Sequence, residues 1–439
     1  ELSHLGEIGS LLNPSEDEID ELKAAAASCS DDLFAATAKT KLESAAAICE
    51  KLSRRFTCTV ANPPYMGSSS FNPFMSKWIK KNYPDVKSDL CTCFIERAFS
   101  LVKPCGYPTL ITMQSWMFLG SFEKMRTKLI AEHSIVSMAH IGARGFDSIG
   151  GEVVSTTVTV FAAGQPGVDG VYLRLVDPVG EAAKQAAARE TIANPDCGYF
   201  YRRNAKTFTQ IPGTPIAYWA SEALLNAFAG GKKLSDIGKP RQGLATGENA
   251  RFVREWWEVG LDREKFDCKS IEESLECGKK WFPYNKGGDF RKWYGNNQCI
   301  IDWQSDGEKI RKFPGAVIRN PDFYFRQSIT WSKISSGSIA FRFKPNGHIF
   351  DVAGTSVFAD EPTLSYLQGA CNCSVIMTVA SMLSPTLNFE VGQIATYPIM
   401  QNEARQPMVV NLVSKLRNDS KLDWDSFETS WDFKRHPLL

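Results

Sequence analysis

The run Phe56–Ala61, followed by Asn62-Pro63-Pro64-Tyr65, constrains the fold of this chain more than any other stretch. Its first six residues, Phe-Thr-Cys-Thr-Val-Ala, form an extended and largely apolar run that predicts a strand. Two successive prolines remove backbone donors and restrict the residue before them, so the strand must end at Asn62. We therefore expect a rigid loop at the carboxyl end of a strand, where open α/β sheets bind ligands.

The residue types of this loop indicate a chemistry. The side-chain amide of Asn62 offers a neutral hydrogen-bond acceptor, and Pro63 can direct a nearby carbonyl inward as a second one. Stacking of a flat base on an aromatic ring such as Tyr65 is worth roughly 1–3 kcal/mol. The loop therefore suits holding a flat, amino-bearing ring while its amine attacks an electrophile, with catalysis by position and fixed dipoles. The alternative interpretation is a proline-rich turn without chemistry.

Several longer stretches carry a resemblance to a known family. The chain resembles the amino-directed DNA methyltransferases, whose motif is (Asp/Asn/Ser)-Pro-Pro-(Tyr/Phe), and among them the PglX family of adenine-specific methyltransferases from BREX phage-defence systems. The similar stretches are NPPYMGSSSFNP (62–73), KNYPDVKSDLCTCFIERAF (81–99), ITMQSWMFLGSFEKMR (111–126), HIGARGFDSIGGEVVSTTVTVF (140–161), QGLATGENARF (242–252), WFPYNKGGDFRKWYGN (281–296), SPTLNFEVGQIATYPI (384–399) and DWDSFETSWDFKRHPL (423–438). The resemblance covers nearly the whole chain after residue 55.

The resemblance implies transfer of a methyl group from S-adenosyl-L-methionine to a flipped adenine of double-stranded DNA, in a restriction-modification type of antiviral defence. It implies catalytic roles for Asn62, Pro63, Pro64 and Tyr65. It further implies base stacking by Phe146, with Ile149 as a rival, and an approach to the cofactor by Asp89 and Phe94. Packing in the core explains Phe146 equally well, and helix capping by Ser88 or Asp89 explains that stretch. Other phage-defence proteins are possible partners.

One departure from the family pattern concerns the cofactor. Family members carry a glycine-rich turn, of the type Asp-Pro-x-Cys-Gly-Ser-Gly, before the Asn-Pro-Pro-Tyr motif, whereas residues 1–55 of this chain contain none. That segment instead predicts a helix that begins near Pro14 and continues through the alanines 24–27. The family often has Asp where this chain has Thr57. We therefore expect a fragment that carries the catalytic loop but lacks the main cofactor strand.

The periodicity of apolar residues predicts the order of elements. After the loop it predicts a helix over 89–102, a strand over 107–113, a helix over 121–131, and strands over 135–141 and 153–162. The fold class is thus α/β, the second half of a doubly wound, Rossmann-like methyltransferase sheet, followed by an α+β target-recognition domain. The predicted divisions are a helical segment (1–55), the catalytic portion (56–163), a linker (164–210), the recognition domain (211–400) and a C-terminal helical segment (401–439).

Two patches of the predicted recognition domain interleave cations with aromatic residues, as suits phosphate contacts and base stacking. By resemblance this region contacts DNA, although exposed cations beside core aromatics would give the same pattern. The predicted DNA-binding residues are Lys286, Arg291, Lys292, Trp293, Tyr294, Arg326, Lys333 and Arg342.

Composition sets the remaining expectations. A formal net charge of +1 excludes a global basic field, so any nucleic-acid surface must be local. The 12 cysteines include two Cys-x-Cys pairs but no Cys-x-x-Cys, and the 5 histidines show no ligand spacing, so we expect reduced thiols and no metal site. With no signal peptide and no apolar run of membrane length, the expected location is the cytoplasm, without membrane contact.

Two rival functions remain at this stage. The absent glycine-rich motif is compatible with a fragment that recognises DNA and transfers nothing. Asn-Pro-Pro-Tyr also serves in protein glutamine methyltransferases, which are typically compact. The large aromatic and basic region after residue 210 argues against that second rival.

Overall fold

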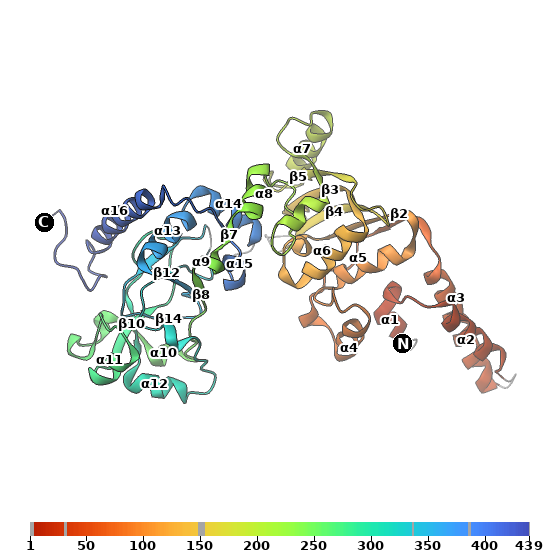
Figure 1. Ribbon diagram of the computed structural model, residues 1–439. Coiled ribbons are helices and arrows are strands. Elements are labelled where there is room, and N and C mark those ends of the chain that lie inside the picture. The colour runs from red at the N-terminus through yellow and green to blue at the C-terminus, as the bar shows by residue number, and fades with distance from the viewer. Residues whose placement is uncertain (1–3, 30–32, 148–153, 336–337, 385–387, 439) are drawn as a thin grey trace. The chain divides into compact units, whose positions relative to one another are not determined.

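The structure is a computed structural model that describes residues 4–29, 33–147, 154–335, 338–384 and 388–438. The chain divides into two compact units, Glu1–Ser221 and Glu222–Leu439. The two units are seen in Figure 1, in which the colour follows the chain.

A six-stranded sheet organises the first unit, in the order β1-β2-β4-β3-β5-β6. β1 lies parallel to β2, and β3 lies parallel to β5, whereas β4 runs antiparallel to both of its neighbours and β6 runs antiparallel to β5. The strands are β1 (Phe56–Ala61), β2 (Val102–Met113), β3 (Ser134–Ala143), β4 (Ser155–Ala162), β5 (Asp169–Arg174) and β6 (Phe200–Asn204). The strands and helices predicted between residues 56 and 162 are thus present, with β1 at one edge.

Two helices cover one face of this sheet, α5 (Leu90–Leu101) and α6 (Glu123–Glu132) (Figure 1). The pleat turns alternate side chains toward them, so Leu110, Met138 and Phe161 are fully buried. Asp89 caps α5 by accepting from the Cys91 N–H at 2.9 Å. A shorter helix, α4 (Pro73–Asn82), adds Trp78 and Ile79 to the same core.

The opposite face of the sheet is much less covered. Ile111 of β2, Val158 and Val160 of β4, and Leu173 of β5 are half-exposed on that face. At the edge, Phe56 is 47% exposed and Val60 is 79% exposed. Parallel strands in α/β proteins are normally buried on both faces, so this apolar face has the character of a surface that another layer covers.

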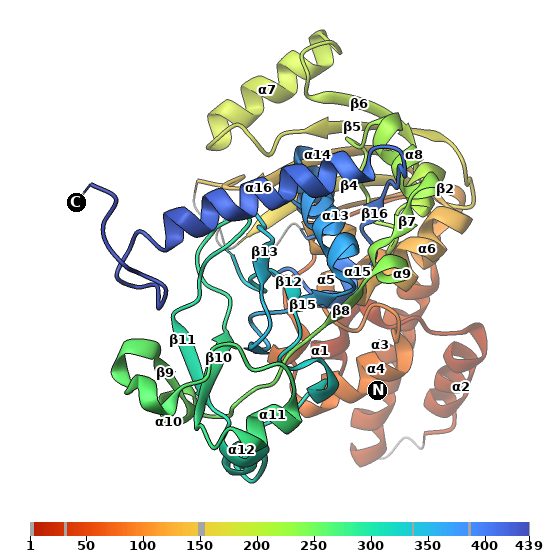
Figure 2. The ribbon, with the colours of Figure 1, turned by 60° about the vertical axis from the view of Figure 1, so that its left-hand side comes forward.

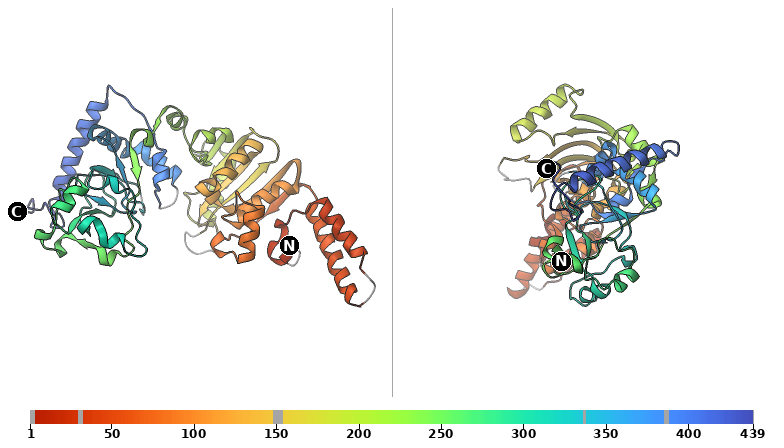
Figure 3. Two further views of the ribbon diagram at one scale, coloured as in Figure 1. Left: turned by 60° about the horizontal axis from the view of Figure 1, so that its bottom comes forward. Right: turned by 90° about the vertical axis from the view of Figure 1, so that its left-hand side faces the viewer.

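The helices at the N-terminal end form an antiparallel pair beside the sheet (Figure 3, red). After α1 (Leu5–Ile8), the helix α2 (Glu16–Ala27) packs on α3 (Leu33–Ser53). A capping box formed by Ser15 and Glu18 begins α2, and α3 leads directly into β1. These helices agree with the Ala-rich helix predicted for this segment.

Arg97 links the N-terminal segment to α5, one of the helices that cover the sheet. Arg97 of α5 is 1% exposed, and its guanidinium donates to the Ser10 carbonyl at 2.9 Å and the Leu52 carbonyl at 2.7 Å. It also donates to Asn13 Oδ1 and Ser100 Oγ, both at 2.6 Å. Because Leu52 lies four residues before β1, this contact fixes where the strand begins relative to α5.

The sequence prediction of a linker over 164–210 is wrong. β5 and β6 extend the sheet, and between them lies α7 (Glu181–Ala193), held by Lys184, whose ammonium donates to the Ile141 and Leu175 carbonyls at 2.7 Å. The chain crosses to the second unit at residue 221 rather than 211. Short strands and an Ala-rich helix resemble linker composition, and only pairing with β3 shows that they belong to the sheet.

The second unit is α+β, as predicted, and it contains two four-stranded sheets and one two-stranded sheet (Figure 2). The sheets have the orders β14-β10-β11-β9, β13-β12-β15-β8 and β16-β7. The strands are β7 (Lys232–Lys233), β8 (Lys239–Arg241), β9 (Val253–Glu255), β10 (Trp281–Asn285), β11 (Cys299–Asp302), β12 (Ser328–Thr330), β13 (Arg342–Lys344), β14 (Ile349–Phe350), β15 (Ser356–Phe358) and β16 (Pro398–Ile399).

The helices of the second unit are α8 (Glu222–Gly230), α9 (Leu234–Ile237), α10 (Asn249–Phe252), α11 (Ile271–Glu276), α12 (Gln304–Arg311), α13 (Glu361–Cys371), α14 (Ser374–Leu383), α15 (Val391–Ala395) and α16 (Gln406–Trp424). α16 packs against α13, so the C-terminal helical segment is part of this unit and not a separate division. Among the described residues no single helix is long and apolar enough to cross a membrane, and α13 and α14 reach that length only together, across a bend of 74°.

We expect Arg97→Ala to lower the free energy of unfolding of the first unit by roughly 3 kcal/mol, because two buried carbonyls lose their donors. Arg97→Lys should restore only part of this loss, since one ammonium cannot reproduce the planar fork of donors. Chemical denaturation measures the effect. Arg55→Ala, at an exposed arginine, is the matched control, and an equal loss in both alanine variants would contradict the role of Arg97.

Candidate functional site

The Asn-Pro-Pro-Tyr loop lies at one end of the sheet of the first unit. β1 ends at Ala61, and because β1, β2 and β3 run in the same direction, their carboxyl ends meet at this end together with the start of β4. Asn62 is exposed, whereas the ring of Pro63 is buried and anchors the loop. The sheet therefore presents the Asn62 amide at its carboxyl end, where the sequence predicted a ligand site.

Asn62 and Tyr65 contact each other within the loop. The Tyr65 hydroxyl donates to Asn62 Oδ1 at 3.2 Å. Tyr65 is half-buried, and this burial raises the pKa of its hydroxyl, so the phenol remains a neutral donor. This hydrogen bond holds the Asn62 amide oxygen and the Tyr65 ring on the same side of the loop, although the two residues are three positions apart in the sequence.

The loop is tied to the start of α5. The Leu90 N–H donates to the Met66 carbonyl at 2.9 Å, and the Ser68 N–H donates to the Ser88 carbonyl at 3.0 Å. These two bonds place Asp89 directly beside the loop, as the cofactor prediction requires. Its carboxylate already accepts the capping bond from Cys91, and Phe94 packs against the core one turn further along. The cofactor roles of Asp89 and Phe94 stay predictions.

Phe146 follows β3 at the same end of the sheet as Asn62. Its ring is half-buried, and the next residue, Asp147, accepts the Glu181 N–H at 3.1 Å and so ties this segment to the start of α7. In the sheet, β2 and β4 lie between β3 and β1, so Phe146 shares the end of the sheet with the loop but does not follow an adjacent strand. Its role in base stacking stays a prediction. The rival residue, Ile149, lies outside the described residues.

Sequence reasoning missed a buried polar chain behind this end of the sheet. His140 of β3 contacts Gln114 Oε1 at 2.7 Å through Nε2 and the Tyr218 hydroxyl at 2.9 Å through Nδ1. Burial, reinforced by the positive charge of Arg174, lowers the pKa of His140 to about 3, so the ring is neutral at pH 7. Gln114 follows β2 directly. These hydrogen bonds join the end of β2 to β3. Their residues come from distant parts of the sequence, so no local motif could have predicted the contact.

The outer edge of β1 bears on cofactor binding. β1 pairs with β2 on one side, and among the described residues no strand pairs with its other side. Its six residues carry no charge and no proline, two of the devices that normally protect an edge strand, although its pairing with β2 is irregular between Phe56 and Cys58. The described residues also supply no glycine-rich turn at this end. The predicted glycine-rich part of a cofactor pocket is therefore not found among the described residues at this end of the sheet.

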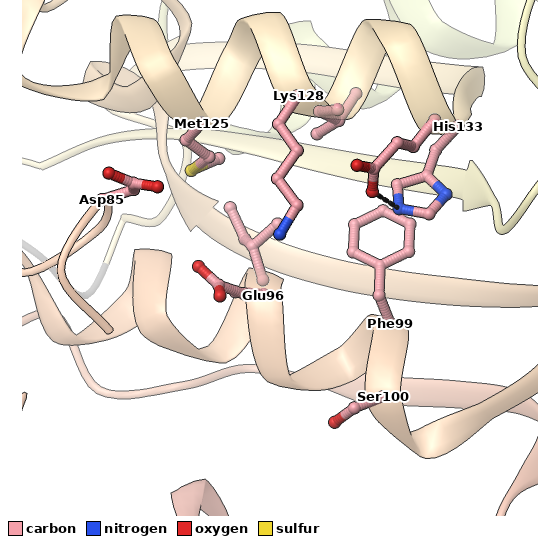
Figure 4. Close-up of a pocket in the computed structure, with 10 residues that line it drawn as sticks. Asp85, Glu96, Phe99, Ser100, Met125, Lys128 and His133 are labelled. Carbon is pink, nitrogen blue, oxygen red and sulfur yellow. Dashed lines mark ion pairs between the residues drawn. The ribbon is translucent and has the colours of Figure 1, made fainter. Parts of the chain in front are cut away.

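A separate hollow lies between α5 and α6, with a volume of about 310 Å³ (Figure 4). His133 stacks on Phe99 with ring centroids 3.9 Å apart, accepts the Gly164 N–H at Nδ1 and points Nε2 toward Glu132 at 3.8 Å. Glu96 and Lys128 face the hollow from opposite helices. Charges of both signs line it on the helix-covered face, so it is distinct from the loop end of the sheet.

The structure distributes the predicted DNA-binding residues unevenly. Arg342 is 1% exposed and donates to Ser332 Oγ at 3.0 Å, and its neighbour on β13, Lys344, is buried against the Gly295 and Asn296 carbonyls. The prediction that Arg342 contacts DNA is therefore wrong, since its side chain faces the interior. Tyr294 is buried too, and Trp293 is half-buried.

Four other predicted cations are engaged within the unit. The pairs are Arg291 with Asp423 at 2.8 Å, Lys333 with Glu390 at 3.0 Å, Lys286 with Asp351 at 3.7 Å, and Lys292 with the Asn372 carbonyl at 3.0 Å. Arg326 differs, because among the described residues it forms no ion pair and only lies against the Phe323 ring. Spacing in the sequence could not distinguish the engaged cations from Arg326.

Comparisons with known proteins agree with this geometry. Residues 10–146 match the family described as Eco57I restriction-modification methylase. The chain is 42% identical over 398 residues to "Adenine-specific methyltransferase PglX" of Lacticaseibacillus casei (strain Zhang), a match that covers 88% of this chain and 33% of that protein. It is 39% identical over 394 residues to "Adenine-specific methyltransferase BrxX" of Escherichia coli O9:H4 (strain HS), covering 88% of this chain and 31% of that one.

Two solved structures share the fold. The Type IIL restriction-modification enzyme MmeI in complex with DNA gives a TM-score of 0.54 at 12% identity, over 86% of this chain and 50% of MmeI. A nuclease-deletion mutant of the Type ISP enzyme LlaGI, with a DNA substrate mimic, gives 0.52 at 12% identity, over 91% of this chain and 37% of LlaGI.

These findings define the class of the molecule: the sheet of the first unit has the Rossmann-like methyltransferase fold of restriction-modification enzymes. More particularly, the chain is similar to the adenine-specific methyltransferases PglX and BrxX along most of its sequence, which confirms the resemblance inferred from the motifs. The chain spans about a third of the length of these curated relatives.

The buried histidine generates a prediction about pH. The folded state holds His140 neutral with a pKa of about 3, whereas the unfolded chain binds a proton near the ordinary value of 6.5. Stability is therefore complete above pH 6.5 and falls as the pH drops toward 3. Between pH 7 and 5 the free energy of unfolding of the first unit should fall by about 2 kcal/mol from this residue.

Denaturant unfolding at several pH values checks this prediction. His140→Gln should flatten the dependence below pH 6.5 even though the variant is less stable at pH 7. The same substitution at His436, near the C-terminal end, is the control. Equal pH dependence in the wild type and His140→Gln would contradict it.

Proposed function

We propose that this chain provides the catalytic loop and the recognition unit of a DNA adenine methyltransferase that transfers a methyl group from S-adenosyl-L-methionine. The observation that carries the proposal is Asn62-Pro63-Pro64-Tyr65 at the carboxyl end of β1, with the amide exposed and the loop held against α5. The similarity to two proteins named as adenine-specific methyltransferases supports the substrate base.

The loop can perform its part without a proton transfer. Asn62 Oδ1 would accept a hydrogen bond from the exocyclic amine, and a carbonyl near Pro63 would accept the second. Two such bonds localise the nitrogen lone pair, which is otherwise delocalised into the ring. To bind a flipped adenine, the Tyr65 hydroxyl would release Asn62 Oδ1, and its ring would stack on the base. The hydrogen bond between Asn62 and Tyr65 would then be present when no base is bound to the loop.

Part of the cofactor site would come from residues that the structure does not describe. S-adenosyl-L-methionine supplies the electrophilic methyl group, and Asp89 and Phe94 are the residues of this chain proposed to approach it. The unpaired edge of β1 and the half-exposed face beside it are suited to an added parallel strand and a covering helix, which could carry a glycine-rich turn.

The partners follow from the reaction. We propose double-stranded DNA as the substrate, in line with the DNA-bound complexes of MmeI and LlaGI. We also propose that the protein belongs to a phage-defence system, contacts other proteins of that system and is located in the cytoplasm.

A second function has one observation in its favour. The open edge of β1 and the missing glycine-rich turn would also fit a polypeptide that recognises DNA and transfers nothing by itself. This second function predicts that the protein binds DNA but does not bind the cofactor. Methylation of a protein glutamine is the weaker alternative, because it assigns no function to the second unit.

Methyl transfer to duplex DNA tests the proposal, both with this chain and with the whole polypeptide that its gene encodes. Asn62→Ala should lower the formation of N6-methyladenine by roughly 100-fold or more, because one of two preorganised acceptors is lost. DNA affinity should change by no more than a few-fold. Mass spectrometry of digested DNA measures the product, and anisotropy measures the affinity.

The matched control is Asn411→Ala on the exposed side of α16. Tyr65→Phe keeps the stacking ring, removes the bond to Asn62, and should retain most of the activity. Full activity of Asn62→Ala would overturn the catalytic assignment. DNA binding without methylation by the wild-type whole polypeptide would instead favour the second function.

A further inference from the structure

A second hollow, with a volume of about 610 Å³, lies in the second unit. It is bounded by β8, by the turn Pro321–Phe323 before β12, by the turn before β14, and by the start of α13. The residues that line it include Lys239, Phe323, Arg326, Gln327, Asn346 and Asp360. These elements come from four separate parts of the chain, so the sequence shows no such cluster.

Three cations at or beside this hollow form no ion pair among the described residues. Lys239 and Arg326 line the hollow and are exposed, and Arg241 of β8 lies against the ring of Phe323, which also lines it. Within the part of the chain that the structure describes, none of the three forms an ion pair. Arg291, Lys286 and Lys333, by contrast, are paired with carboxylates elsewhere in the same unit.

An aromatic ring orders the two guanidinium groups. The Arg241 and Arg326 guanidinium carbons lie 5.2 and 5.6 Å from the centroid of the Phe323 ring. Phe323 is itself fixed by Phe358, whose ring centroid is 4.8 Å away. Cation–π contact restricts both arginines before any ligand arrives, which reduces the entropy lost on binding. Guanidinium forks match phosphate oxygens in geometry.

The remaining polar groups suit the same ligand. Asn346 Oδ1 accepts the Gln327 N–H at 2.9 Å, which leaves the side-chain amide donors of both residues at the rim. The carboxylate of Asp360 accepts the Thr363 N–H at 2.9 Å as the cap of α13, and hydrogen bonding by the Thr363 side chain, together with this N–H, lowers the pKa of the carboxyl group. Its charge is thereby partly satisfied inside the fold, and the cations dominate the hollow.

We propose that the hollow lined by Lys239, Arg326 and Phe323, with Arg241 held against the same ring, binds backbone phosphates of duplex DNA and is the main anchor of the second unit on its substrate. The proposal rests on the proposed function, since it assumes that DNA is the substrate. The phosphate contacts would then come from β8 and the turn before β12, and not from the engaged cations between residues 286 and 294.

The test is the salt dependence of affinity, measured by fluorescence anisotropy with the whole chain and a mixed-sequence duplex. Each phosphate contact adds about 0.9 to the slope of log affinity against log salt. The double variant Lys239→Gln with Arg326→Gln should lower the slope by about 1.8. Arg326→Lys with Lys239 intact should keep the slope close to that of the wild type, because the charge remains.

The matched control is the double variant Lys415→Gln with Lys434→Gln, which removes two exposed charges elsewhere in the same unit. Thermal unfolding of each variant shows whether the unit remains folded. A wild-type slope in the Lys239 and Arg326 double variant, or an equal loss in the control, would overturn the hollow as the anchor while leaving the proposed function intact. No DNA binding by the wild-type chain would overturn both.

Discussion

The hydrogen bonds of Arg97 hold together the parts on which the candidate site depends. One buried guanidinium joins the segment before α2, the end of α3 and the middle of α5. α3 leads into β1, and the start of α5 is bonded to the loop that follows β1. The strand and its loop are therefore fixed at both ends by one helix. A buried arginine must have its donors satisfied, so this arrangement allows few alternatives.

The direction of the strands then determines what meets at the loop. Because β1, β2 and β3 point the same way, Asn62, Gln114 and the segment of Phe146 lie at one end of the sheet. The neutral His140 braces that end from inside, between Gln114 and Tyr218. Hydrogen bonds within the loop and to the start of α5 hold the segment of Asn62 in place, and the same sheet has, among the described residues, an unpaired edge and a half-exposed apolar face. The unit thus combines an ordered loop with a surface that an added layer could cover.

In the second unit, charge is mostly internal. Several cations that the sequence suggests for DNA are engaged by Asp423, Glu390, Asp351 or a backbone carbonyl, and Arg342 and Lys344 are buried. With a formal net charge of +1, a phosphate-binding surface must come from a few cations that the fold leaves unpaired. Arg241 and Arg326 meet this condition because an aromatic ring, rather than a carboxylate, holds them.

The sequence alone determined the strand that ends at Asn62, the order of the elements from β1 to β4, the α+β class of the second unit, and the resemblance to adenine-specific methyltransferases. These features depend on local patterns: alternation, helical periodicity, and prolines that end a strand. Only the tertiary structure decided that residues 164–210 extend the sheet, that Asn62 bonds Tyr65, that Arg342 is buried, and that Lys239 and Arg326 share one hollow. Those outcomes depend on pairing between distant segments, and a charged side chain looks the same in sequence whether a partner reaches it or not.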